Sequence, residues 1–195
     1  MSAYEQARRQ IDAAHAADPE RLPDGSAAEL IYANRLEEWV QKLVPDASEI
    51  LRLAARCQHL ERWKTPRSSF PQDRTGYLLW RKSLYKTQAD RAKSIFLETG
   101  ISHTEANEAY AWISKTGLKT NSGTQALEDA AVLVFLEHEI TGFAASHPDY
   151  TREKFIGILR KSWNKITPAA QAFAVQLPFP PTIASLIHEA VSGAP

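Results

Sequence analysis

Residues 125–136 read Gln-Ala-Leu-Glu-Asp-Ala-Ala-Val-Leu-Val-Phe-Leu, and the last seven of them form an unbroken apolar run. A helix that is apolar on every side is typical of a buried, central position. Thr124 can cap such a helix, and Pro148 follows it, so we expect a helix over 125–145. Glu128 and Asp129 lie in its first turn, where carboxylates suit the helix dipole. This stretch favours an all-helical protein built around one central helix.

A second apolar helix is expected over 47–63, where Asp46 and Glu49 have the spacing of a capping box. Its apolar residues cover a wide arc. Its polar side chains fall at steps of three and four along one stripe, and they are Arg52, Arg56, His59 and Arg62. We expect this helix to pack against the helix over 125–145 at the centre of the molecule.

Start signals for helices recur along the rest of the chain, and they include the capping boxes Ser2 with Glu5 and Ser102 with Glu105 and the pair Thr167-Pro168. No segment alternates as a strand does. The sequence therefore predicts an all-α single domain over 1–195, a bundle of about eight helices. Besides the two central helices, the expected helical segments are 2–17, 27–43, 76–99, 102–116, 151–165, a short helix from 168, and 182–191. An ordered loop is expected between Lys64 and Thr75.

Composition excludes several classes of protein. The 195 residues contain 23 basic and 23 acidic side chains. A net charge of zero gives no reason to expect nucleic acid or an acidic membrane as a partner, although it is compatible with a local basic patch. Cys57 is the single cysteine, which excludes a disulfide framework and suits a reducing cytoplasm. There is no signal peptide and no apolar run of membrane-spanning length, so we expect a cytoplasmic protein.

Polar residues on the two central helices are the candidates for chemistry. His59 on one helix and Asp129 on the other are the parts of a divalent-metal site or of an acid–base pair, with Glu128 as a further ligand or general base. Arg56 and Arg62 suit phosphate, because the guanidinium fork matches its oxygens.

A purely structural role is the alternative for each of these residues. His59 can be a core histidine bonded to Asp129 or Glu128. The arginines can pair with Glu49 or Glu61 on their own helix, where such pairs contribute little to stability.

Several motifs, taken together, resemble a family of uncharacterised bacterial and fungal proteins, the domain of unknown function four-two-zero-two. The resemblance covers roughly residues 27–177, with helices flanking this core on both sides. Some fungal members carry the label glutamyl-tRNA synthetase, but this chain has no nucleotide-binding motif of a synthetase. The residues that carry the resemblance are Tyr32 to Arg35, Ala54 to His59, Arg62-Trp63, Pro66 to Ser68, Asp73 to Tyr77, Trp80-Arg81, Leu127 to Asp129 and Val134 to Glu137.

The family's helical pattern is in turn similar to that of the HD phosphohydrolases, in which histidines and aspartates from separate helices hold metal ions. The resemblance implies HD-like orthogonal packing, with Gln58-His59 in the place of the His-Asp pair and Asp129 in the place of the distant aspartate. The resemblance to the uncharacterised family itself implies a histidine three residues after Tyr85, where this chain has Gln88. Because an amide is a poorer ligand for a transition metal than imidazole, metal binding is expected to be weakened or lost.

Two functions follow from these observations, and a helical scaffold that binds no small ligand is the third alternative. The first is a metal-dependent hydrolase of a phosphorylated or nucleotide-like small molecule, in which His59 and Asp129 hold the metal and Glu128 is catalytic. The second is a non-catalytic helical module that recognises an anionic ligand. In both, Gln58 and Gln88 line the site, and the anion is held by arginines: Arg56, Arg62, Arg67 and Arg74.

Overall fold

A computed structural model describes residues 1–192. These residues form ten α-helices, two short 3-10 helices and one π-helical segment, and they contain no β-strand. The all-helical class is therefore confirmed, with more helices than the sequence predicted. No helix within this range is long and apolar enough to span a membrane.

The chain divides into two compact units, of which the first is Met1–Leu127 and the second begins at Glu128. That residues 1–195 form one domain stays a prediction, and so does the packing of the two central helices. The first unit contains α1 (Ala3–Ala16), α2 (Ala28–Leu43), α3 (Glu49–Arg56), α4 (Arg74–Glu98), α5 (His103–Ile113) and the start of α6 (Ser122–Val134).

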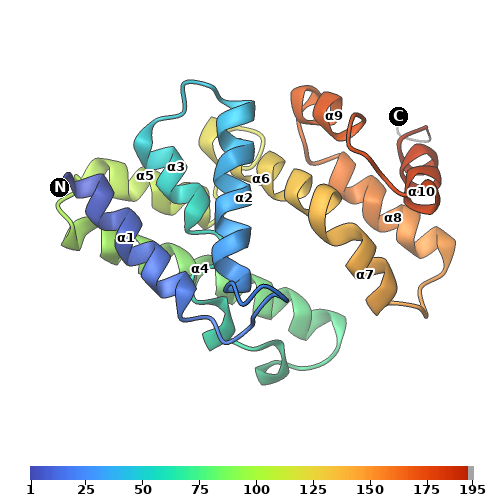
Figure 1. Cartoon of the computed structure of the whole chain (residues 1–195), viewed down its shortest axis with the longest axis horizontal. Helices are drawn as coiled ribbons and strands as arrows, with labels where there is room; N and C mark the ends of the chain where they lie inside the picture. Colours follow the sequence, from blue (N-terminus) through green and yellow to red (C-terminus); the bar gives the residue numbers. More distant parts are fainter. Residues whose placement is uncertain (193–195) are drawn as a thin grey trace. The chain divides into compact units, whose positions relative to one another are not determined.

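Within the first unit, α4 packs along α5, α3 contacts α2 and α5, and α1 contacts α3 and α4 (Figure 1). Several helix ends are as the sequence predicted. Ser2 and Glu5 form the capping box of α1, and Ser102 caps α5. The core of this unit includes Ile11, Leu36, Val40, Ile95, Phe96 and Ile113, all fully buried.

The predicted helix over 47–63 is wrong at both ends. The carbonyl of Val44 accepts a hydrogen bond from the Ala47 amide at 2.9 Å, so the chain turns before the helix begins. Ser48, not Asp46, is the N-cap of α3. The helix stops at Arg56, and the chain continues through a tight turn into a 3-10 helix at Arg62–Lys64.

The predicted helix over 125–145 begins earlier and is interrupted. Asn121 caps α6, since its side-chain oxygen accepts hydrogen bonds from the amides of Gly123 and Thr124. Thr124 instead lies buried and donates its hydroxyl to the carbonyl of Thr116 at 2.7 Å. After Val134 the helix widens into a π-helical segment, Phe135–Glu139, before α7 (Ile140–Ser146).

The second unit continues with three further helices. Thr151 caps the first, which begins one residue later than the sequence predicted, and Thr167-Pro168 opens the second as predicted. The three helices are α8 (Arg152–Trp163), α9 (Pro168–Ala174) and α10 (Pro181–Ser192). α8 packs against α10.

Candidate functional site

The turn that follows α3 has a strained backbone. His59 and Glu61 have φ angles of +62° and +54°, in the left-handed region that side chains other than glycine rarely adopt. Such strain costs about 1–3 kcal/mol per residue and persists only where the surroundings hold it in place. The turn presents the His59 ring on the outer side of a buried segment that includes Cys57 and Gln58.

His59 is fixed by two residues of α2. Its Nδ1 lies 3.1 Å from a carboxylate oxygen of Glu29. Its ring stacks on that of Tyr32, with the centroids 4.1 Å apart and the planes 6° from parallel. Glu29 and Tyr32 share a face of α2 because residues three apart on a helix are neighbours.

Arg62 covers the other face of the His59 ring. One of its terminal nitrogens lies 3.2 Å from Nδ1 and 3.1 Å from Nε2. Nearly equal distances to both ring nitrogens place this terminal nitrogen out of the plane of the imidazole, because an atom in the plane would collide with the carbon between them. The guanidinium carbon also lies 5.1 Å from the centre of the Trp80 ring. The result is a layered cluster of Tyr32, His59, Arg62 and Trp80.

The charges of this cluster are set by their neighbours. Burial lowers the pKa of His59, although the nearby Glu29 opposes the shift. Burial alone would raise the pKa of Glu29, but the hydrogen bond with His59 and the charge of Arg62 outweigh it, so this pKa is lowered. At neutral pH the cluster therefore holds a neutral imidazole, a carboxylate and a guanidinium. A neutral histidine held by a carboxylate is an arrangement suited to general-base work.

Arg56 lies in a different environment from the one expected for an anion-binding residue. Its side chain is 4% exposed, and its Nη1 lies 2.8 Å from the carboxylate of Glu37. Its Nε donates to Asp12 at 2.9 Å and its Nη1 to Asn34 at the same distance. These partners come from α1 and α2, not from the carboxylates of its own helix that the sequence suggested. Arg8 and Arg52 also contact Glu37.

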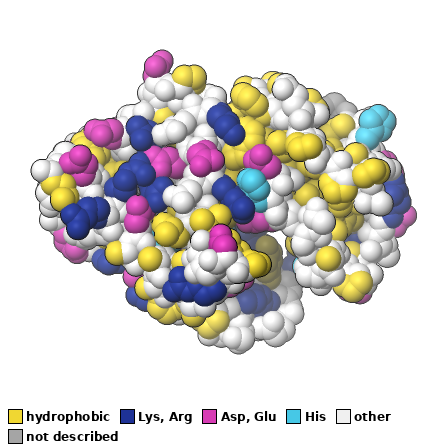
Figure 2. All heavy atoms as spheres, viewed as in Figure 1, with side chains coloured by type: hydrophobic (Ala, Val, Ile, Leu, Met, Phe, Trp, Pro, Cys, Tyr) yellow, Lys and Arg dark blue, Asp and Glu magenta, His cyan; other side chains and the backbone are white. Residues whose placement is uncertain are grey.

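Basic and acidic side chains alternate on the surface over α1 and α3 (Figure 2). A small pocket with a volume of about 70 Å³ lies there, lined by Tyr4, Glu5, Arg8, Glu49, Arg52 and Leu53. Hydrogen bonding to Glu105 raises the pKa of Tyr4 to about 12. The arginines of this pocket already share the carboxylate of Glu37, so the pocket holds no excess of positive charge aimed at a ligand.

The loop between α3 and α4 is ordered by its own hydrogen bonds. Arg67 donates to the carbonyls of Phe70 and Asp73, both at 3.1 Å. Arg74 is exposed in the first turn of α4, where Asp73 is the N-cap. A role of these two arginines in binding an anion stays a prediction.

Glu128 and Asp129 belong to the second unit, where both are buried. Asp129 accepts hydrogen bonds from the Thr167 amide at 3.1 Å and from its hydroxyl at 2.6 Å, next to the start of α9. Glu128 lies 3.4 Å from the ammonium group of Lys165. Their roles as metal ligand and catalytic residue, and the pairing of Asp129 with His59, stay predictions.

Gln58 and Gln88 are 5% and 4% exposed, and the amide nitrogen of each lacks a hydrogen-bond partner within the described chain. Burying an unpartnered amide costs about 1–3 kcal/mol. The same range of residues contains no group of three or more His, Cys, Asp or Glu side chains placed to share a metal ion. The divalent metal expected from the sequence therefore stays a prediction.

Sequence reasoning did not identify Glu29 or Trp80 as parts of the site. The spacing of Glu29 and Tyr32 places them on one helix face, which was an available signal. Trp80 belongs to a motif of the family resemblance, but its place beside Arg62 depends on the loop between them. The Nε1 of Trp80 donates to the carbonyl of Thr65 at 2.8 Å and so brings the loop to α4.

Fold and cluster together define an all-helical protein with a histidine held between an aromatic ring and a guanidinium. The chain belongs to the family described as a domain of unknown function (DUF4202), whose model matches residues 5–187. The match extends beyond both ends of the 27–177 core that the sequence suggested. No curated protein and no solved structure gives a significant match to the chain.

Proposed function

We propose that the first unit binds an anionic, phosphorylated small molecule through Arg62. The observation that carries the proposal is the position of this guanidinium over the neutral ring of His59. Glu29 faces Nδ1 of His59 at 3.1 Å, and within residues 1–192 Arg62 forms no ion pair with a carboxylate. A guanidinium that lies between two rings and has one terminal nitrogen at His59 keeps its other N–H groups for contact with phosphate oxygens.

The Glu29–His59 pair supports hydrolysis of the bound phosphate ester as a second function. The carboxylate orients the imidazole, whose pKa is lowered so that it can accept a proton at neutral pH. This second function keeps the phosphohydrolase hypothesis, but its general base is His59 instead of Glu128. The positive charge of Arg62 beside both ring nitrogens disfavours a second cation there, so the proposal assigns His59 to proton transfer or ligand contact.

The finer expectations from the sequence belong to the same proposal. They are the HD-like packing, a divalent metal held by His59 and Asp129, Glu128 as the catalytic residue, and a cytoplasmic location. Binding by Arg62 does not depend on any of them.

The test is a calorimetric titration of the purified protein with inorganic phosphate, with pyrophosphate and with AMP. We expect Arg62→Ala to weaken binding at least about tenfold, because a charge-assisted contact contributes about 1.5–3 kcal/mol. Arg62→Lys should retain part of the affinity, since it keeps the charge but not the planar fork.

Arg152→Ala is the matched control, because it removes the same charge from an exposed site in the second unit. Its affinity should equal that of the unaltered protein. Equal affinity of Arg62→Ala, with its helical content unchanged, would refute the proposal, as would the failure of all three compounds to bind. Turnover of a phosphate ester that disappears in His59→Gln while binding persists would support the second function.

A further inference from the structure

The zero net charge of the chain conceals a strongly basic segment. Residues 62–93 contain nine Lys and Arg side chains and two acidic ones, so this segment carries a net charge of +7. The remaining residues carry 14 basic and 21 acidic side chains, or −7. The segment consists of the loop after α3 and most of α4, and it belongs entirely to the first unit.

The same segment exposes large apolar side chains. Seven large hydrophobic residues are exposed among those described, and four of them lie in this segment. They are Trp63 at 37%, Tyr77 at 42%, Leu78 at 54% and Leu79 at 53% exposed. Scattered exposed hydrophobic residues are ordinary, but a group with a charged rim marks an interaction surface.

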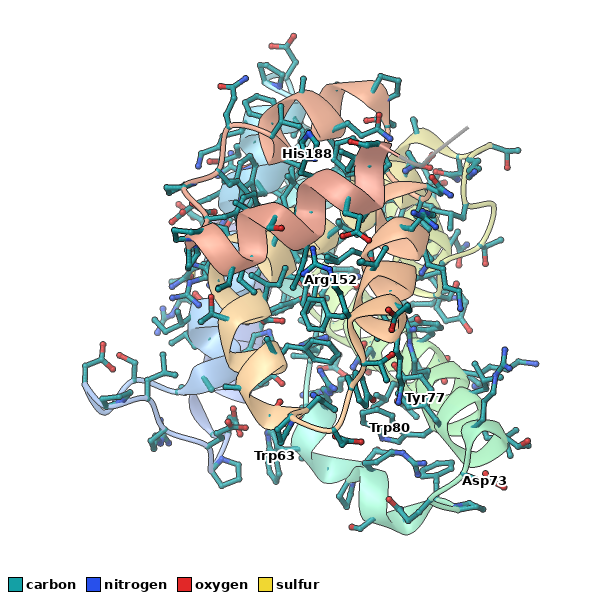
Figure 3. The ribbon with its side chains drawn as sticks, turned by 90° about the vertical axis from the view of Figure 1, so that its right-hand side faces the viewer. Trp63, Asp73, Tyr77, Trp80, Arg152 and His188 are labelled. Carbon is teal, nitrogen blue, oxygen red and sulfur yellow. The ribbon has the colours of Figure 1, made fainter. Side chains whose placement is uncertain are left out.

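The loop and the start of α4 form one ordered surface. The hydrogen bond from Trp80 to Thr65 attaches the loop two residues after Trp63. The loop returns against the helix at Gly76, where an added Cβ would lie 2.0 Å from the carbonyl oxygen of Pro71. Trp63, Tyr77 and Trp80 lie along the same end of the unit in Figure 3. We call the group Trp63, Tyr77, Leu78 and Leu79, with Lys64, Arg74 and Lys82, the tip surface.

Helix geometry explains why three consecutive residues of the tip surface are exposed. Successive residues of a helix are turned by about 100°, so Tyr77 to Leu79 span more than half of the circumference. Only the side that carries Trp80 faces the unit. The first turns of α4 therefore project from the unit with leucine side chains outermost.

We propose that the tip surface docks on a membrane that contains anionic lipids. Leucine and aromatic side chains enter the boundary between headgroups and acyl chains, while Lys and Arg beside them attract acidic headgroups. Asp73, the acidic residue nearest to Tyr77 in the segment, has its carboxylate bonded to the Gly76 amide as the helix cap. Lys64 pairs with Glu61, just before the segment, at 2.8 Å, so the basic charge that complements an anionic surface comes mainly from Arg74 and Lys82.

The cations beside the aromatic rings of the tip surface favour a lipid surface over nucleic acid as its partner. Lys64 lies 5.4 Å from the centre of the Trp63 ring, and Arg81 lies 5.8 Å from that of Tyr77. A cation over each ring leaves less room for the base stacking that single-stranded nucleic acid needs. Leu78 and Leu79 have no function in stacking, whereas insertion into lipid uses both. This inference does not rest on the function proposed for Arg62.

The experiment is flotation of the full chain with vesicles of phosphatidylcholine alone and with phosphatidylserine added. We expect the protein to float with the anionic vesicles, and the bound fraction to fall as salt screens the charges. Leu78→Ser/Leu79→Ser should lower the partition coefficient at least about tenfold, because insertion energy follows the apolar area buried. Lys64→Glu/Lys82→Glu should lower it on anionic vesicles.

Matched controls lie in the second unit, where Val175→Ser alters a side chain that is 61% exposed and Lys161→Glu reverses an exposed charge. Both should bind vesicles as the unaltered protein does, and circular dichroism should give the same helical content for all variants. Failure to bind anionic vesicles would overturn the proposal, and so would a leucine variant that binds normally. Binding of single-stranded RNA without binding of vesicles would overturn it in favour of a nucleic-acid surface.

Discussion

Arg56 illustrates how the surroundings of a residue decide its role. From the sequence it is an arginine on the same stripe as Arg62, and both are suited to phosphate. In the structure Arg56 joins α3 to α1 and α2 through Asp12, Asn34 and Glu37, whereas Arg62 lies over the ring of His59. Arg56 and Arg62 differ because α3 ends between them, so only Arg56 lies on the buried side of α3.

Replacing Arg56 should therefore affect stability first. Arg56→Ala leaves the carboxylate of Glu37, which is 8% exposed, without its buried partner. We expect a loss of about 3–5 kcal/mol in the free energy of unfolding, measured by urea denaturation. Arg152→Ala removes an ion pair whose side chains are 49% and 52% exposed, and should change stability by about 0–1 kcal/mol. Similar losses in the two variants would contradict the structural role of Arg56.

Among the helices, the observed ends and interruptions differ from the sequence-based prediction more than the positions of the helices do. Ser2, Ser102 and Thr167 are caps in the structure as the sequence predicted, because a cap is a local hydrogen bond between residues close in the chain. The end of α3 at Arg56 and the π-helical segment Phe135–Glu139 have no such local signal. Both depend on how the chain packs.

Gly76 is an element-scale position that can be tested. A methyl group there would meet the backbone of Pro71, so the loop would have to move away from α4. We expect Gly76→Ala to lower the free energy of unfolding by about 1–3 kcal/mol, as overpacking does. Thermal denaturation followed by circular dichroism measures the effect.

Gly157→Ala is the matched control for this prediction, because no atom lies within 4 Å of its added Cβ in α8. It should raise stability by up to about 1 kcal/mol, since alanine favours helix more than glycine does. A neutral or stabilising Gly76→Ala would mean that the loop does not press on α4 in solution.

For the whole molecule, the buried titratable groups favour neutral over acidic pH. Burial lowers the pKa of His15, whose Nε2 bonds to the Arg56 carbonyl at 2.7 Å. The pKa of Glu37 is also lowered, because hydrogen bonds from Arg8 and Arg56 outweigh the opposing effect of burial. Each of these groups holds fewer protons in the folded chain than in the unfolded chain over part of the acid range.

Stability should accordingly fall as the pH is lowered from 7 to 5. An unfolded histidine takes up a proton below its ordinary pKa of about 6.5, whereas folded His15 resists it, so acid favours the unfolded chain. The carboxylates add to the loss only below about pH 4.5. Melting temperatures in a pH series measure the slope. His15→Gln should reduce the slope of melting temperature against pH between pH 7 and 5, and His15→Gln/His59→Gln should reduce it further. An unchanged slope in both variants would exclude the buried histidines as its origin.

The all-helical class and most helix starts can be predicted from the sequence, because apolar periodicity and capping hydrogen bonds act over a few residues. His59 and Arg62 can be singled out as polar residues on an otherwise apolar helix. Three features depend on the tertiary structure: the carboxylate that reaches His59, the ion-pair network around Arg56, and the position of Trp80 beside Arg62. Such pairings join residues 15 to 44 positions apart, and the energy that selects them comes from burial and charge neutralisation across helices, which local patterns do not contain.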